Sequence, residues 1–207
     1  MLFKSNKIAH VRFIKGDGSS VRNETGWQDK YIIGWAGRLT PVKDCATFLD
    51  AAAIIRDCCE EARFIVAGDG EQRAMLQQRA HNLNLDGILV FLGNRTDMPS
   101  VMSAMDIFVL SSLNEGFGRV IVEAWASETA VVSTSVGGTI DVIEDTVSGI
   151  LVPPSKPKFI AEEVCKLLKK KGLRDRLIRN GFERAQLFDT RLMVEKFEKI
   201  YAEILEI

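Results

Sequence analysis

Two glutamates stand on either side of a glycine pair in the stretch SSLNEGFGRVIVEA, residues 111–124. Gly116 and Gly118 allow backbone N–H groups to approach a ligand closely, and the helix that we expect to begin at these glycines offers a positive dipole end to a phosphate. Glu115 precedes that helix and Glu123 lies about two turns later. If the whole interval were helical it would rise by about 12 Å, which suits two ends of an extended polar ligand and not a catalytic carboxylate pair sharing one bond.

An alternative interpretation makes Glu115 a complement to the helix dipole and Glu123 a surface charge. That interpretation leaves Glu123 unexplained. The residues that flank it are apolar: Ile121, Val122, Ala124 and Trp125. A carboxylate in such surroundings needs a partner, so the sequence indicates a ligand for Glu123.

Basic side chains follow an apolar run in the segment GRLTPVKD, residues 37–44. Arg38 offers a planar fork of donors and Lys43 a compact positive charge. We expect a helix to start near Pro41, which would place Lys43 in its first turn, where acids are preferred over bases. An anion there would resolve the conflict. Two solvated surface cations explain this loop equally well when it is considered alone.

Three further loops carry weaker signals. In AGDGE, Asp69 favours a helix N-cap. In LGNRTDM, Asn94 and Arg95 could contact a base or could simply be exposed. In SVGGTIDVI, Gly137 and Gly138 can turn backbone amides toward an anion, although a double glycine alone is only a turn signal.

Several common site signatures are absent from the 207 residues. No GxGxxG supports a dinucleotide oxidoreductase, no GxxxxGK[ST] supports a P-loop nucleotidase, and no Asp-x-Asp pair supports a metal site. The two histidines, His10 and His81, cannot build a hydrolase triad. With 27 basic and 28 acidic side chains the net charge is -1, which predicts no attraction to nucleic acid.

The elements that must position these loops alternate along the chain. Short apolar runs occur at residues 31–37, 63–68, 88–93, 107–112, 130–135 and 150–152, and segments with helical periodicity separate them. Such runs are typical of strands buried on both faces. The pattern therefore predicts an α/β fold: a Rossmann-like parallel sheet of about six strands, with helices on both faces. Ligands bind such sheets at the carboxyl ends of the strands, where the loops described above would meet.

The two ends of the chain differ in pattern. Residues 1–30 predict an irregular segment or linker because KGDGSSVRNETG is rich in Gly, Ser and Asn. Residues 31–207 predict one domain whose last part, from about Lys156, is helical with interruptions near Gly172 and at residues 188–190. No apolar run is long enough for a membrane span, and no signal-peptide pattern is visible.

The four cysteines show no metal-binding or CxxC spacing: Cys45, Cys58, Cys59 and Cys165. The adjacent pair Cys58 and Cys59 would rarely bridge. Reduced thiols in a cytosolic protein are therefore the prediction.

Seven segments, in order, carry a resemblance to a known family: GRLTPVKD, AGDGE, FLGNRTDM, SAMDIFVLSS, NEGFGRVIVEAWA, VGGTIDVIED and SGILVPP. They resemble the C-terminal, nucleotide-sugar-binding half of the group 1 glycosyltransferases, retaining enzymes of family four with the two-domain GT-B fold. The resemblance covers about residues 31–205. At its centre are two glutamates with seven residues between them, matched by Glu115 and Glu123.

The resemblance implies roles for the loop residues. Arg38 and Lys43 would bind the donor diphosphate and neutralise charge as the nucleotide leaves, and Glu115 would face the donor sugar or its phosphates. The implied donor-binding residues are Glu123 at the ribose, Phe117 and Gly118 with Gly116 at the diphosphate, Asn94 and Arg95 near the base, and Gly137 with Gly138. Ile140 and Asp141 depart from the family pattern, which usually has proline and glutamate there.

The resemblance also implies a UDP-linked sugar as donor, with no metal and no other cofactor, and leaves the acceptor open among a sugar, a lipid-linked acceptor and a polysaccharide. The family's N-terminal acceptor domain has no counterpart in this sequence, so the chain alone would bind nucleotide and transfer little or nothing. The segment TRLMVEKFEKIYAEIL resembles the one that packs back onto that domain. The whole enzyme would be cytoplasmic, with peripheral attachment at the inner membrane face. A non-catalytic nucleotide-sugar-binding module and a GT-B-type epimerase stay as alternatives.

Overall fold

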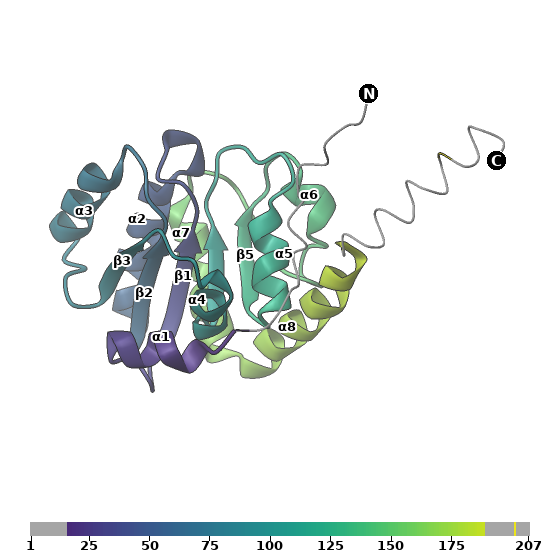
Figure 1. The fold of residues 1–207 in the computed structure, drawn as a ribbon, viewed down its shortest axis with the longest axis horizontal. Helices are drawn as coiled ribbons and strands as arrows, with labels where there is room; N and C mark the ends of the chain where they lie inside the picture. Colours follow the sequence, from purple (N-terminus) through teal and green to yellow (C-terminus); the bar gives the residue numbers. More distant parts are fainter. Residues whose placement is uncertain (1–15, 189–200, 202–207) are drawn as a thin grey trace, which may run out of the picture.

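The computed structural model describes residues 16–188 and residue 201. Its centre is a six-stranded parallel sheet in the order β3-β2-β1-β4-β5-β6 (Figure 1). The strands are β1 (Tyr31–Ala36), β2 (Ala62–Ala67), β3 (Leu89–Gly93), β4 (Ile107–Leu110), β5 (Ala130–Thr134) and β6 (Ile150–Val152). The predicted fold class is confirmed, and each of the six predicted strands is present within about two residues of its expected bounds.

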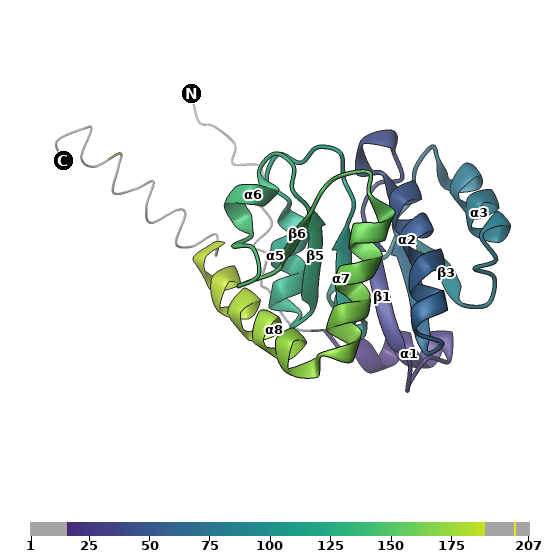
Figure 2. The same ribbon diagram turned by 180° about the vertical axis from the view of Figure 1, so that it is seen from behind.

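Helices cover both faces of the sheet. One face carries α1 (Gly18–Thr25), α4 (Met98–Ala104) and α5 (Arg119–Ala126) (Figure 1), and the other carries α2 (Cys45–Cys58) and α7 (Pro157–Lys169) (Figure 2). The remaining helical elements are η1 (Pro41–Lys43), α3 (Arg73–Asn82), α6 (Thr139–Val142), α8 (Lys171–Ala185) and η2 (Gln186–Phe188). None of the helices in the described part of the chain is long and apolar enough to cross a membrane.

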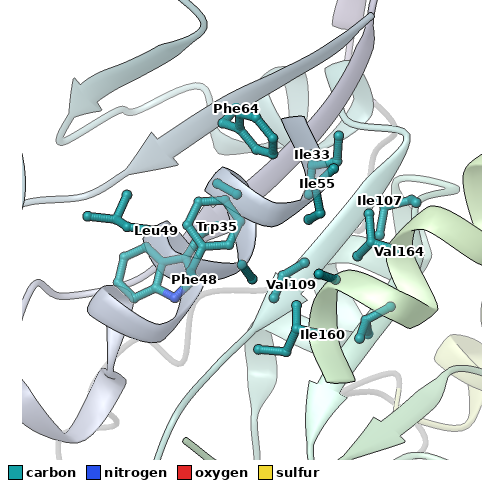
Figure 3. Packing of buried hydrophobic residues seen from close by; sticks show 14 of the residues in the cluster. Ile33, Trp35, Phe48, Leu49, Ile55, Phe64, Ile107, Val109, Ile160 and Val164 are labelled. Carbon is teal, nitrogen blue, oxygen red and sulfur yellow. The ribbon is translucent and has the colours of Figure 1, made fainter. Parts of the chain in front are cut away.

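Alternating strand residues supply the two hydrophobic layers. On β1, Ile33 and Trp35 join the core under α2 and α7, whereas Ile32 and Ala36 join the core under α4 and α5. This follows from the two-residue period of a strand, whose successive side chains point to opposite faces. Figure 3 shows Trp35 and Phe48 of α2 among the buried side chains of the first layer. Because both faces are apolar, the polar groups of this region concentrate in the loops at the strand ends.

The prediction of an irregular segment over residues 1–30 is wrong for Gly18–Thr25, which forms α1. Asp17 caps this helix by accepting a hydrogen bond from the Ser19 amide at 3.0 Å, and Gly26 ends it in the left-handed conformation. The polar and glycine residues that indicated a loop are therefore the two caps of a short helix. Val21 is fully buried, and Arg22 pairs with Asp106 at 2.8 Å, so α1 is fixed against the sheet domain.

The helical C-terminal part begins as predicted with α7, and the interruption predicted near Gly172 lies at Lys170, so that Gly172 itself is inside α8. α8 reaches both core layers, because Leu177 joins the first and Ala185 the second. The predicted terminal helix over residues 190–205 lies outside the described residues, apart from Tyr201.

The prediction of four reduced cysteines is wrong. Cys58 at the end of α2 and Cys165 in α7 form a disulfide, with 6.6 Å between their Cα atoms. The two residues are 107 positions apart, and only the side-by-side packing of α2 and α7 brings them together. Cys45 and Cys59 are free. The predicted cytosolic location rested partly on reduced thiols, and the disulfide removes that support.

Oxidised protein unfolded in denaturant is expected to expose two titratable thiols and not four. Cys165→Ser should lower the free energy of unfolding by about 2–4 kcal/mol, because the bond closes a long loop in the unfolded chain. A colorimetric thiol count and a urea titration check the two statements. Cys59→Ser is the control and should leave the stability of the disulfide-bonded protein nearly unchanged. Four reactive thiols in protein purified without reductant would contradict the disulfide.

Candidate functional site

A cleft of about 990 Å³ opens at the carboxyl ends of the first four strands. The strand order reverses between β1 and β4, which lie side by side although their loops run outward in opposite directions. This is where ligands bind in open parallel sheets. Eight of the eleven predicted site residues line the cleft: Arg38, Lys43, Asn94, Arg95, Glu115, Phe117, Gly118 and Glu123. Gly116, Gly137 and Gly138 do not line it.

Lys43 and Glu115 form an ion pair across the cleft floor. The Lys43 Nζ lies 2.5 Å from Oε1 of Glu115, and the Ser112 hydroxyl donates to the same oxygen at 2.8 Å. Glu115 is buried, with 8% of its surface exposed. A helix begins at Pro41 as expected, but it is the single-turn 3-10 helix η1, which Lys43 ends directly before Asp44, the N-cap of α2. The position of Lys43 is explained by the carboxylate that it faces.

Arg38 is exposed at the cleft, and its side chain makes no hydrogen bond or ion pair with the described residues. The backbone next to it is well fixed, since the Leu39 amide donates to the Asp69 carbonyl at 2.9 Å. Asp69 is not the N-cap of α3, which is Gln72. Its carboxylate instead accepts from the Gly70 amide and from Arg73, and these bonds hold its pKa below the ordinary value.

Arg95 is held between two carboxylates. Its guanidinium makes two bonds to Asp97, at 2.8 and 2.9 Å, and two to Glu24 of α1, both at 3.0 Å. These hydrogen bonds, first those to Asp97 and then those to Glu24, raise the pKa of Arg95 further above its ordinary value. The planar side chain is thus fixed in the cleft wall, and its charge is already balanced. Neighbouring Asn94 is exposed.

The loop that carries Glu115, Phe117 and Gly118 rests on the glycine pair that follows β5. The Gly138 amide donates to the Glu115 carbonyl at 2.9 Å, and a Cβ on Gly138 would lie 2.0 Å from the carbonyl oxygen of Gly116. The Gly138 amide is therefore committed to the protein and is not available to an anion. The close backbone contact gives this glycine a positioning role in the structure.

α5 begins at Arg119, after Gly118 in the left-handed conformation with φ of 73°. The interval from Glu115 to Glu123 is therefore not helical throughout, as the 12 Å estimate assumed. The N-terminal end of α5 faces the cleft, because Phe117, Gly118 and Arg119 all line it. This end has no acidic residue in its first turn and no side-chain cap, so its free amides and dipole can stabilise an anion.

Glu123 is half-buried in the cleft wall one turn further along α5. Its carboxylate has no hydrogen-bond or ion-pair partner among residues 16–188 and 201. Burial raises the pKa of this carboxyl, and the charge of Arg119 partly opposes the rise. A half-buried carboxylate without a partner, beside a cleft, fits a ligand that donates hydrogen bonds.

Sequence reasoning missed several contributors to the cleft: Glu24, Asp97, Ser112 and Arg119. The spacing of Arg119 four residues before Glu123 on a predicted helix was a usable signal. Glu24 lies 71 residues from Arg95, and no pattern in the sequence links them. In the described ranges, no group of three or more His, Cys, Asp or Glu side chains is arranged to hold a metal ion.

A family model described as "Glycosyl transferases group 1" matches residues 19–184. The chain is 32% identical over 206 residues to the D-inositol 3-phosphate glycosyltransferase of Saccharomonospora viridis, covering 94% of this chain and 48% of that protein. The chain spans about half the length of the curated relatives it matches.

Two solved structures share both fold and sequence similarity. HepE of Anabaena, in complex with UDP-glucose, is 29% identical with a TM-score of 0.84, covering 90% of this chain and 52% of that one. The C-terminal domain of LpcC, a group 1 family glycosyl transferase of Francisella tularensis, is 31% identical with a TM-score of 0.72. That match covers 80% of this chain and 91% of the LpcC domain.

Glu123→Gln is expected to raise the melting temperature by a few degrees at pH 7. The pKa of Glu123 is raised in the folded protein, so the fold favours the protonated form, and the wild type loses stability as pH rises through that pKa. Glutamine has no charge to desolvate. The difference should shrink as pH falls toward 4.5, the ordinary glutamate value. Thermal melts across this range check it, with the exposed Glu162→Gln as control; a lower melting temperature for Glu123→Gln at pH 7 would contradict it.

Proposed function

This chain belongs to the group 1 glycosyltransferases, and we propose that it is the donor-binding half of a retaining enzyme that moves a hexosyl group from a nucleoside diphosphate to an acceptor hydroxyl. One observation carries the proposal: a single cleft holds cations at a helix N-terminus and, one turn further along the same helix, a half-buried carboxylate, and none of these side chains is paired with another described residue. The cations at the helix N-terminus suit the phosphates of a donor, and the carboxylate suits the two hydroxyls of its ribose.

The diphosphate lies at the start of α5 in this proposal. The amides of Phe117 and Gly118 and the helix dipole meet its oxygens, and Arg38 and Arg119 add positive charge. Glu123 lies about 6 Å along the helix axis from Arg119. Its carboxylate accepts hydrogen bonds from the ribose hydroxyls and so gains the partners that the described residues do not supply.

Lys43 is already paired with Glu115 before a donor binds. We assign to Lys43 and Arg38 the stabilisation of charge that develops on the departing diphosphate, the role that a divalent cation has in many transferases. Glu115, buried and fixed by Ser112, faces the donor sugar or the phosphate next to it. Because the pair is preorganised, no large rearrangement of these side chains is needed when the leaving group gains charge.

The nucleobase lies along the wall that Asn94 and Arg95 form. Arg95 is balanced by Glu24 and Asp97, so it offers a fixed planar surface to the base and little net charge to the phosphates. We propose uridine as the base, supported by the UDP-glucose complex of the 29% identical HepE.

The acceptor site belongs to a second domain in this proposal, supported by curated relatives about twice as long as this chain. The acceptor is a sugar, a lipid-linked acceptor or a polysaccharide, bound by that domain. A cytoplasmic location, at the inner membrane face for a lipid-linked acceptor, is proposed from the family resemblance alone, since the disulfide does not support it. The chain alone binds nucleotide and transfers little or nothing. Regiospecific sugar transfer by these 207 residues alone would overturn this part.

Calorimetric titration with UDP, GDP, ADP and NAD tests the donor site. We expect one nucleoside diphosphate, UDP, to bind selectively, and Arg38→Ala and Glu123→Ala each to weaken it about 10- to 100-fold, because each removes hydrogen bonds to a charged group. Arg179→Ala, exposed on α8, is the matched control. Preference for NAD, or unchanged affinity in both variants, would contradict the proposal.

A further inference from the structure

The loop of residues 115–118 needs support from outside itself. Phe117 stands between two glycines, and a Cβ on Gly116 would meet nothing within 4 Å. Two glycines in three residues leave the backbone with wide conformational freedom. The amides of this loop nevertheless must hold one orientation if they are to receive a diphosphate.

One side of the loop is supported by the glycine pair after β5, through the Gly138 amide and its close approach to the Gly116 carbonyl. The other side is supported by an aromatic contact. The rings of Phe117 and Phe188 lie edge to face, with centroids 5.4 Å apart and planes at 72°. Phe117 is 43% exposed, so its own burial does little to fix it.

Phe188 is well placed to hold its partner. It belongs to η2, directly after α8, and packs against the core layer under α5. α8 is itself fixed close to α5, because Gly181 lies against Trp125 so closely that a Cβ would come within 2.4 Å of the indole. Near its end, Arg184 donates to the Val142 carbonyl at 2.6 Å. The Phe188 ring is thus connected to the rigid part of the domain.

We propose that Phe188 is a positioning residue for the donor diphosphate: through the Phe117 ring it fixes the loop whose amides receive the phosphates. The inference rests on the proposed function for the identity of the ligand, but the restraint on the loop exists without any ligand. The segment η2, directly after α8, thereby acts on the site although Phe188 does not line the cleft.

Nuclear magnetic resonance relaxation of the backbone amides in the ligand-free 207-residue chain is the first test. In Phe188→Ala, the order parameters of the amides of residues 115–118 should fall from about 0.85 to below about 0.6, the change from rigid to flexible backbone, while those of β5 are unchanged. Phe188→Tyr, which keeps the ring, should behave as wild type, and Leu187→Ala, at a neighbour that is 62% exposed, is the control. Unchanged order parameters in Phe188→Ala, or an equal fall throughout the domain, would overturn the proposal.

Titration with UDP and with uridine is the second test. Phe188→Ala should weaken UDP about two- to tenfold and leave uridine within about twofold, because only UDP uses the loop amides. On a Phe117→Ala background, Phe188→Ala should add no further loss, since its partner ring is gone. Equal losses for both ligands, or additive losses, would overturn the proposal. If the wild type binds neither ligand, the proposed function fails, and the relaxation measurement alone decides whether Phe188 restrains the loop.

Discussion

The parallel pairing of β1 with β4 is the constraint on which the rest of the site depends. The register sets Ile33 beside Ile107 and Gly34 beside Phe108, so the two strands end at the same edge. Lys43 and Glu115, 72 residues apart, then come within contact distance. Neither loop could form the cleft floor alone, because each supplies one charge of the pair. Without Lys43, the buried carboxylate of Glu115 would have no compensating charge.

The charges around the cleft divide into those already balanced and those left open. Lys43 with Glu115, Arg95 with Glu24 and Asp97, and Arg73 with Asp69 are paired within the protein. The side chains of Arg38, Arg119 and Glu123 make no hydrogen bond or ion pair with the described residues. The paired groups give the walls a fixed shape, and the open groups are those with free capacity for a ligand. If the cleft takes the proposed donor, this division directs its phosphates and its ribose diol to separate places in the cleft.

The fold and the cleft lining could be predicted because they depend on local pattern. Strands buried on both faces, such as Ile107–Leu110, appear as continuous apolar runs, and loop residues such as Arg38 are located once the strand ends are known. What could not be predicted depends on contacts between distant segments. The disulfide needs α2 beside α7, and the Glu24–Arg95 pair needs α1 folded onto the sheet. α1 itself was missed because its capping residues are also the residues of loops.

The carboxylate of Glu123, which has no hydrogen-bond or ion-pair partner among the described residues, has a consequence for the lifetime of the protein. The folded chain without ligand carries an unfavourable desolvated charge, and a ligand that satisfies this charge binds the folded state alone. If that ligand is the sugar donor, supply of the donor changes the fraction of chains that open and meet proteases. A cell short of the donor would then also lose the protein that uses it, and abundance would follow substrate without any change in gene expression.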